Sequence, residues 1–259
     1  MPFTVATYNV LATVYIKPAV YPGVPEHLLR PEWRLPALIK HIEALDADIV
    51  CLQELEPDVF AALDERLGAA GYTGRYEQKG RNKPDGCATF FRHGTFSLRE
   101  ARRVEYRDRE RGPEDHSGHI AALLTLDHGG HRLGVANTHV RWQSPDTPRD
   151  QNIGLREVTE LVEVCRGFDP LCRDWVVCGD FNFRPNSEVV GVMRDAGFTF
   201  AHADCPEARS GVANGRAKLV DYLFHTVGLR SRPFDPPAIT DDTKLPSPDQ
   251  PSDHLALVA

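Results

Sequence analysis

Short apolar runs typical of β-strands recur along this chain, and amphipathic helical patterns stand between them. Residues 3–10 (FTVATYNV) alternate and are rich in β-branched and aromatic types, which predicts a strand. Residues 33–45 repeat apolar side chains three and four positions apart, which predicts an amphipathic helix. Because each such element must bury an apolar face against another, this order of strands and helices predicts an α/β domain.

The same patterns continue through the rest of the chain. Further strands are expected at residues 48–52, 72–77, 87–92, 96–106, 120–126, 132–140, 175–178, 219–225 and 255–258. Further helices are expected at residues 57–67, 149–168 and 187–196, and an irregular, proline-rich loop at residues 18–31. Neither a low-complexity linker nor an internal repeat divides the chain. We therefore expect one domain, residues 1–259, with two sheets flanked by helices.

Charge and apolar content limit the partners of this chain. The net charge is −7 at pH 7, which disfavours a long, tight nucleic-acid footprint because phosphate contacts need Lys and Arg. The balance favours short or small phosphate substrates. No apolar run approaches the roughly 18 residues that span a bilayer, and the first residues lack the features of a signal peptide. We expect a cytoplasmic protein with no membrane association. The 6 cysteines form no CxxC pair and predict buried free thiols.

Two charged segments are expected to be loops. Residues 79–86 are basic and are expected to be mobile. Residues 107–118 are dense in charge and turn formers, which favours a solvated surface loop; the alternative is that one of its arginines contacts a substrate.

Polar side chains stand where several expected strands end. Asn9 ends the first strand, Glu54 follows the second, and His139 lies at the end of residues 132–140. A carboxylate at such a position can bind Mg²⁺, although Glu56 would serve as well as Glu54 by position alone. Taken singly, an asparagine there is more often a turn residue and a histidine a structural hydrogen-bonding group.

The strongest signals lie in the second half of the chain. Asp180 and Asn182 follow an apolar strand, and their spacing places both on one face if the strand continues. Asp221 lies inside the apolar run of residues 219–224, where a carboxylate is costly unless it is paired. His254 is the expected partner of Asp221, which leaves Asp253 able to contact a metal.

Seven short motifs occur in the order seen in the endonuclease/exonuclease/phosphatase superfamily. They are ATYNVLA, IVCLQELE, DGCATFFR, NTHV, GDFN, VDYLF and PSDH. Within that superfamily the chain most resembles the branch of Ccr4-type deadenylases, nocturnin, Angel proteins and the 2′-phosphodiesterase. The resemblance implies a DNase I-like, four-layer α/β sandwich of two packed mixed sheets flanked by helices. It also implies hydrolysis of a phosphate ester that depends on Mg²⁺ or Mn²⁺.

The resemblance also assigns roles to individual residues. A metal would be held by Glu54, with Asn9 beside it and Asp253 as a possible second ligand. Catalysis would involve Asp180, Asn182, His139, His254 and Asp221. Asp180 would orient or deprotonate the attacking water, while Asn182, His139 and His254 would stabilise charge on the phosphate. Substrate contacts are expected from Asn182, His139, Arg141, Trp142 and Arg216.

One departure from this branch concerns the base. Where the deadenylases carry an aromatic residue that stacks on adenine, this chain has Arg216. We therefore do not expect poly(A) specificity, and Arg216 could instead bind a second phosphate.

Two activities stay open at the level of sequence. The first is a phosphodiesterase or 3′-exonuclease on RNA or short oligonucleotides. The second is a phosphomonoesterase or 2′,3′-cyclic phosphatase acting on a nucleotide or a terminal phosphate. A metal-free binding module is a third, disfavoured interpretation, because the polar set is complete. No obligate protein partner is expected.

Overall fold

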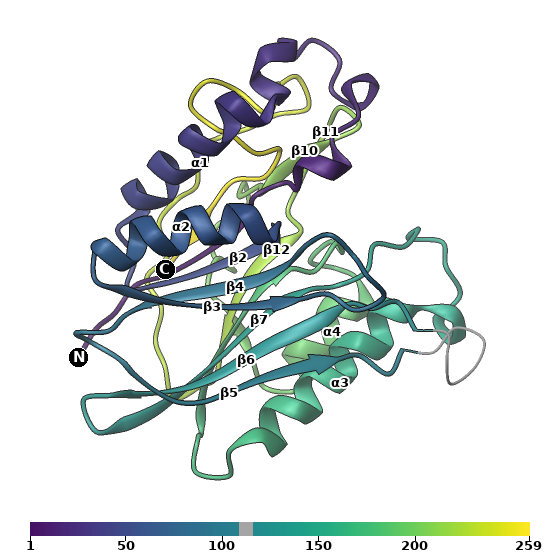
Figure 1. The fold of residues 1–259 in the computed structure, drawn as a ribbon. Coiled ribbons are helices and arrows are strands. Elements are labelled where there is room, and N and C mark those ends of the chain that lie inside the picture. Colours follow the sequence, from purple (N-terminus) through teal and green to yellow (C-terminus); the bar gives the residue numbers. More distant parts are fainter. Residues whose placement is uncertain (109–115) are drawn as a thin grey trace.

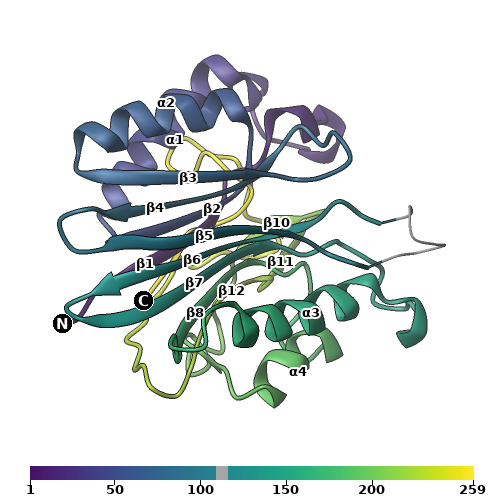
Figure 2. The ribbon, with the colours of Figure 1, turned by 60° about the horizontal axis from the view of Figure 1, so that its bottom comes forward.

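Two mixed β-sheets pack face to face, and helices cover both outer faces (Figure 2). The computed structural model describes residues 1–108 and 116–259. The four layers confirm the expected α/β sandwich, and the alternation of strand and helix patterns explains them, because each helix buries one apolar face on a sheet.

The first sheet has five strands in the order β13-β1-β2-β4-β3. Its strands are β1 (Val5–Asn9), β2 (Ile49–Leu55), β3 (Tyr72–Gln78), β4 (Gly86–Arg92) and β13 (Leu257–Val258). Its outer face is covered by α1 (Pro31–Leu45) and α2 (Pro57–Ala69) (Figure 1). Strands β1 and β2 are parallel and pair from Val5–Ile49 to Asn9–Gln53. Their polar ends therefore lie at the same edge of the sheet.

The second sheet has six strands in the order β5-β6-β7-β8-β12-β9. Its strands are β5 (Ser97–Glu105), β6 (Ile120–His128), β7 (His131–His139), β8 (Asp174–Asp180), β9 (Thr199–Phe200) and β12 (Asp221–His225). Helices α3 (Ile153–Phe168) and α4 (Glu188–Asp195) pack on its outer face (Figure 2). Strands β7 and β8 are parallel, with His139 opposite Asp180.

Several elements differ from the expectations. The hairpin of β10 (Gly211–Ala213) and β11 (Arg216–Lys218) was not expected, and neither was β9. Residues 149–168 form two elements, the short η4 (Arg149–Gln151) and then α3, because the Asn152 side chain accepts a hydrogen bond from the Leu155 amide and starts a new helix there.

Short 3-10 helices also precede α1. Two of them, η2 (Pro18–Val20) and η3 (Glu26–Leu29), lie within residues 18–31, which were expected to be irregular, and η1 (Thr13–Tyr15) lies before that range. Helix α4 begins after Ser187, whose side chain accepts from the Val190 amide at 3.2 Å, so the expected N-cap is confirmed.

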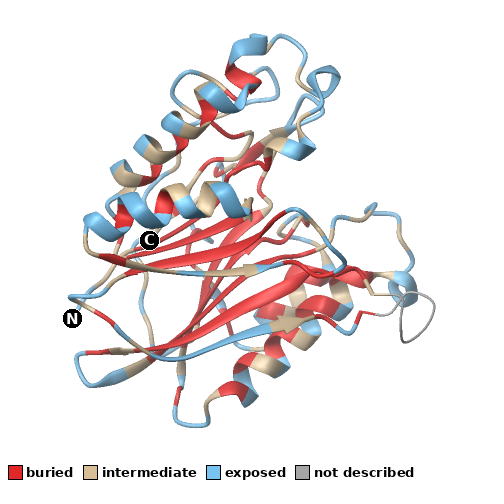
Figure 3. Cartoon of the chain, viewed as in Figure 1, coloured by how far each residue is buried: buried red, intermediate tan, exposed pale blue. Residues whose placement is uncertain are grey.

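The core lies between the two sheets and beneath the helices (Figure 3). It also contains a polar contact that joins the sheets. The buried Gln53 amide of β2 donates to Asn137 Oδ1 of β7 at 2.8 Å and to Thr7 Oγ1 of β1 at 3.0 Å. A buried amide is costly when it lacks a partner, so these bonds favour one relative position of the sheets close to their polar edge.

Other expectations concern cysteines, membranes and charged loops. All six cysteines are free; five are buried and Cys205 is partly exposed. Over the described ranges, no helix is both long and apolar enough to cross a membrane. Most of the charged segment at residues 107–118, including residues 109–115 with two of its arginines, lies outside the described residues. The remaining arginine, Arg107, binds Glu160 at 2.8 Å.

Candidate active site

Polar side chains from both sheets meet at one edge of the sandwich. The parallel pairs β1–β2 and β7–β8 end together, which brings Asn9 beside β2 and His139 opposite Asp180. Strand β12 runs antiparallel to β8, and its first residue, Asp221, pairs with Asp180. Parallel strands end at the same edge of a sheet, so this convergence follows from the topology.

Glu54 points into this edge because β2 contains a bulge. The pairing of β2 with β4 shifts between Gln53 and Leu55, and Glu54 has a φ of 54°. A bulge turns a side chain out of the regular alternation of a strand. The Glu54 carboxylate accepts from Asn9 Nδ2 at 3.1 Å and from the Ala12 amide at 3.0 Å.

The structure separates Glu54 from Glu56, which position in the sequence could not do. Glu56 Oε2 accepts from the Thr13 amide at 2.8 Å and so holds the start of η1. Glu54 is the one of the two whose carboxylate lies with His139 and Asp180.

Asp180 is buried and held from two sides. Asn9 Nδ2 donates to its Oδ2 at 2.9 Å, and the Asn182 amide donates to its Oδ1 at 2.8 Å. Burial, together with the charge of Asp221, raises the pKa of Asp180 to about 7. Its carboxyl group is therefore poised to exchange a proton near neutral pH.

Asp180 and Asn182 were expected to share one face if the strand continued past Asp180, and the strand does not continue. Strand β8 ends at Asp180, and Asn182 has a φ of 58°, outside strand geometry. Instead, the Asp180 carboxylate accepts from the Asn182 amide at 2.8 Å, which closes the short segment between them. Gly179 is required before it, because a Cβ there would lie 1.8 Å from the Thr138 carbonyl oxygen.

His139 lies between a buried lysine and Asn182. Lys79 Nζ lies 3.1 Å from His139 Nδ1, and Asn182 Nδ2 lies 3.0 Å from Nε2. Burial, followed by the charge of Lys79, holds the pKa of His139 well below its usual range. An ammonium group only donates hydrogen bonds, so Nδ1 accepts from Lys79 and the neutral ring carries its proton on Nε2. Asn182 Nδ2 is also a donor, so the two N–H groups do not bind each other, and both can donate to an acceptor placed between them.

Lys79 is a site residue that sequence reasoning missed. It forms a buried ion pair with Asp85 at 2.5 Å, and Asp85 also accepts from the Tyr15 hydroxyl at 2.7 Å. Residues 79–86 were expected to form a mobile loop, and the structure shows that Lys79 and Asp85 near its two ends are buried and joined by this ion pair. A lysine and an aspartate flanking a turn between two strands were the signal available in the sequence.

His254 pairs with Asp221, as expected. Its Nδ1 lies 2.7 Å from Asp221 Oδ2, and its Nε2 lies 3.8 Å from Asp180 Oδ2. Burial alone would lower the pKa of His254, but the charges of Asp221, Asp180 and Asp253 raise it well above its usual value. His254 is therefore an imidazolium that faces the centre of the site.

The remaining predicted residues lie around this centre. Asp253 accepts from the Tyr21 hydroxyl at 3.1 Å. The Arg141 amide donates to Glu157 at 2.8 Å. Trp142 is 61% exposed. It lines, with Asn182 and Arg216, a cavity of about 590 Å³.

The arrangement fits a divalent metal ion. The ligand atoms of Glu54, His139 and Asp180 lie within 4.8 Å of one another, and so do those of Asp180, Asp221 and His254. In the second group Asp221 and His254 already bind each other, which leaves the first as the better candidate. Burial raises the pKa of both Glu54 and Asp180, and a cation between two buried carboxylates would offset that cost. Carboxylate oxygens are the ligands that Mg²⁺ prefers.

Asn9 orients both of these carboxylates. Its Nδ2 donates to Glu54 and to Asp180, while its Oδ1 accepts from the Leu11 amide at 3.0 Å. The amide therefore holds the two acidic groups at a fixed separation.

Comparison with known proteins places this geometry among phosphoester hydrolases. Residues 6–254 match the Endonuclease/Exonuclease/phosphatase family. Carbon catabolite repressor protein 4 homolog 6 of Arabidopsis thaliana is 29% identical over 213 residues, covering 74% of this chain and 27% of that protein. Protein angel homolog 2 of Mus musculus is 30% identical over 249 residues, covering 91% of this chain and 43% of that protein. The chain thus spans less than half of either relative.

Solved structures share the fold over nearly the whole chain. A crystal structure of ANGEL2, described as a 2′,3′-cyclic phosphatase in complex with adenosine-2′,3′-vanadate, superposes with a TM-score of 0.84 at 23% identity. The match covers 99% of this chain and 94% of that one. The human Nocturnin catalytic domain with a bound sulfate anion superposes with a TM-score of 0.74 at 24% identity, covering 99% and 92%.

Proposed function

The chain belongs to the Endonuclease/Exonuclease/phosphatase family, and from that premise we propose that it is a phosphodiesterase that acts as a 3′-exonuclease on RNA or short oligonucleotides. Mg²⁺ or Mn²⁺ is the proposed cofactor. The observation that carries the proposal is the cavity of about 590 Å³ that continues from Asn182 and is lined by Trp142 and Arg216. An exposed indole and a guanidinium beside a phosphate-binding centre suit a nucleotide, because bases stack on aromatic rings and phosphates pair with arginine.

Asp180 is the proposed base. Its carboxylate is fixed by hydrogen bonds from Asn9 and the Asn182 amide, and a carboxylate held in this position can take the proton from an attacking water. The released hydroxide attacks phosphorus in line with the leaving oxygen.

Three side chains stabilise the charge that develops on the phosphoryl oxygens. His139 presents its Nε2 proton, Asn182 its amide, and His254 a positive imidazolium held by Asp221. Donors that are already oriented before the reaction stabilise a transition state more than mobile solvent does.

Glu54 and Asp180 would hold the metal ion. When bound, the metal would supply Lewis-acid stabilisation of the phosphate and its leaving oxygen. Asn9 keeps the two carboxylates in place for that purpose.

The second candidate is a phosphomonoesterase or 2′,3′-cyclic phosphatase. The structural likeness to ANGEL2, which is described as a 2′,3′-cyclic phosphatase, favours it. The same three donors and the same base would serve there, since the chemistry at phosphorus is the same.

A substrate panel separates the two activities. The purified protein would be incubated with Mg²⁺ or Mn²⁺ and three RNA substrates, ending in a 3′-hydroxyl, a 3′-phosphate and a 2′,3′-cyclic phosphate. Progressive shortening of the first substrate supports the exonuclease. Loss of the terminal phosphate, or opening of the cyclic phosphate, without shortening would replace it with the second candidate. Treatment with EDTA should stop either reaction, and added Mg²⁺ should restore it.

A further inference from the structure

Three cations line the cavity of about 590 Å³ beside Asn182, which we call the nucleotide cavity. We call Arg184, Arg216 and Lys218 the cationic ridge. Arg216 and Lys218 are two positions apart on β11, so they share one face of the hairpin. Arg184 comes from the turn after Asn182. Burial, together with the charges of Arg184 and Arg216, lowers the pKa of Lys218, as expected when like charges lie close together.

The ridge lacks the acidic partners that usually accompany surface cations. Over residues 1–108 and 116–259, none of these three side chains forms an ion pair. Among the described residues that line the nucleotide cavity, the one carboxylate is Glu188, which binds Arg149 at 3.2 Å. An uncompensated group of cations on a chain with a net charge of −7 costs free energy through mutual repulsion. An anionic ligand would relieve that cost.

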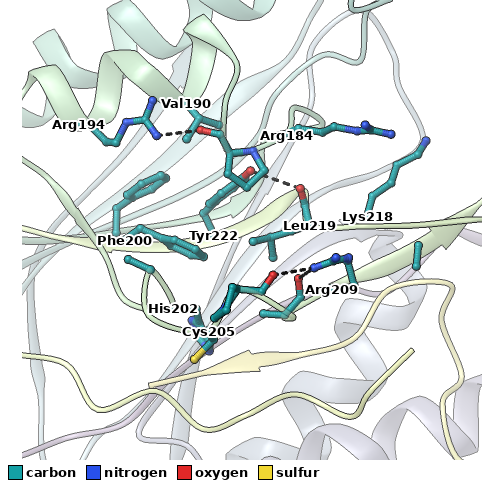
Figure 4. A pocket seen from close by; sticks show the side chains of 16 residues that line it. Arg184, Val190, Arg194, Phe200, His202, Cys205, Arg209, Lys218, Leu219 and Tyr222 are labelled. Carbon is teal, nitrogen blue, oxygen red and sulfur yellow. Dashed lines mark hydrogen bonds between the residues drawn. The ribbon is translucent and has the colours of Figure 1, made fainter. Parts of the chain in front are cut away.

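The ridge also separates two cavities. Arg184 and Lys218 line the nucleotide cavity beside Asn182 and also a second cavity of about 520 Å³. Figure 4 shows both side chains extending along one side of this second cavity. A ligand that leaves the catalytic centre through the first cavity therefore meets the ridge before it reaches the second.

The second cavity is suited to a flat organic group. Its lining includes the aromatic residues Phe200, Tyr222 and Phe224. Tyr222 and Phe224 are fully buried and stack on each other with centroids 5.2 Å apart, so the partly exposed Phe200 is the ring that a ligand could contact. Two more arginines, Arg194 and Arg209, line it, and no described lining residue is acidic. Some of these guanidinium groups donate to backbone carbonyl groups of the surrounding loops, as Arg194 does to the Pro185 carbonyl at 2.9 Å.

We propose that Arg184 and Lys218 bind the phosphate that precedes the scissile one in a single-stranded oligonucleotide, with the attached nucleoside directed toward the second cavity. The inference rests on the proposed exonuclease function and gives it a substrate class: chains with at least two phosphodiester bonds. A phosphate on the ridge would pair with two cations, which suits the charge-assisted contacts that guanidinium and ammonium groups make with phosphate.

The test compares a dinucleotide, which carries only the scissile phosphate, with the trinucleotide that adds the preceding one. The double variant Arg184→Met with Lys218→Met removes both positive charges and keeps the length of the side chains. The wild-type protein should cleave the trinucleotide with a kcat/KM about ten-fold or more above that of the dinucleotide, as loss of charged hydrogen bonds to one phosphate implies. The double variant should lose this preference, because its kcat/KM should fall about ten-fold or more further on the trinucleotide than on the dinucleotide.

Two controls keep the test decisive. Arg75→Gln removes an exposed arginine of the other sheet and should retain the full preference, while Arg184→Lys with Lys218→Arg keeps both charges and should retain most of it. Equal wild-type rates on the two substrates, or an unchanged preference in the double variant, would overturn the inference.

A binding measurement separates failure of this inference from failure of the proposed function. Fluorescence anisotropy with a labelled trinucleotide and the Asp180→Asn protein needs no turnover. Binding is compared between the Asp180→Asn protein and the same protein that also carries the double substitution. If neither substrate is cleaved by the active protein, yet the double substitution weakens binding of the trinucleotide at least about ten-fold, the exonuclease assignment is wrong and the phosphate-binding role of the cationic ridge is supported. If cleavage proceeds and binding is equal in both proteins, the ridge assignment fails alone.

Discussion

His254 Nδ1 lies 2.7 Å from Asp221 Oδ2, so a residue near the end of the chain is fixed against the first residue of β12. The pair converts a histidine into a buried cation beside Asp180. Much of the electrostatics of the site depends on this one contact.

Asp221→Asn should move the alkaline limb of the pH profile of kcat/KM to lower pH. The substitution removes the carboxylate that contributes most to raising the pKa of His254, so the imidazolium loses its proton at lower pH. The measurement is a pH profile of both proteins at saturating Mg²⁺. An alkaline limb that does not move would show that His254 does not act as a cation.

The same pair links stability to pH. The folded protein binds the His254 proton more tightly than the unfolded chain, so the stabilisation is full below the ordinary pKa of 6.5 and is lost as pH rises through the raised value. Asp221→Asn should flatten this fall in the free energy of unfolding, measured by urea denaturation across the range.

Asp180→Asn should lower turnover sharply with little change in folding. The amide cannot take a proton from water, but it has nearly the same shape and can still accept from the Asn182 amide. We expect kcat to fall by about 10²–10⁴-fold, the usual contribution of a general base. Retained activity in the folded variant, with an unchanged circular dichroism spectrum, would contradict the role of Asp180.

Glu54→Gln should weaken metal binding, whereas Glu56→Gln should not. Glu54 shares the metal cluster with Asp180, while Glu56 holds the Thr13 amide at the start of η1. Isothermal titration calorimetry with Mg²⁺ and Mn²⁺ measures the affinity, which we expect to fall by about ten-fold or more in the first variant. Equal losses in both variants would mean that the bulge at Glu54 does not select the ligand.

Glu157→Gln should make the protein less sensitive to rising pH. Glu157 is buried and accepts from the Arg141 amide at 2.8 Å and the Ser117 hydroxyl at 2.9 Å. Burial, followed by its contact with Asp108, raises the pKa of Glu157 well above 4.5. The folded state therefore keeps a proton that the unfolded chain has lost, and stability falls by about 1.4 kcal/mol per pH unit between the two pKa values.

The glutamine side chain does not titrate, so the free energy of unfolding of the variant should not show this fall with rising pH. Urea unfolding at several pH values between about 5 and 9 compares the two proteins. Glu163→Gln, an exposed position on the same helix, is the matched control and should behave as the wild type. Parallel stability curves for the wild type and Glu157→Gln would refute the raised pKa.

The elements of the fold were largely predictable because their signals are local. Alternation marked β1, three-to-four spacing marked α1, and Ser187 marked the start of α4. The elements that were missed, β9 and the β10–β11 hairpin, have two or three residues per strand. Strands that short carry too few residues for a period to be visible.

The sequence by itself determined which side chains stand at strand ends, since Asn9, His139 and Asp180 each close an apolar run. Only the tertiary structure decided what those side chains do. A bulge in β2 turns Glu54, and not Glu56, into the site. Lys79 contacts His139 although 60 residues separate them in the sequence. Arg184 and Lys218 line the same two cavities. The physical reason is that protonation states and ion pairs depend on burial and on neighbours in space, and those neighbours come from distant parts of the chain.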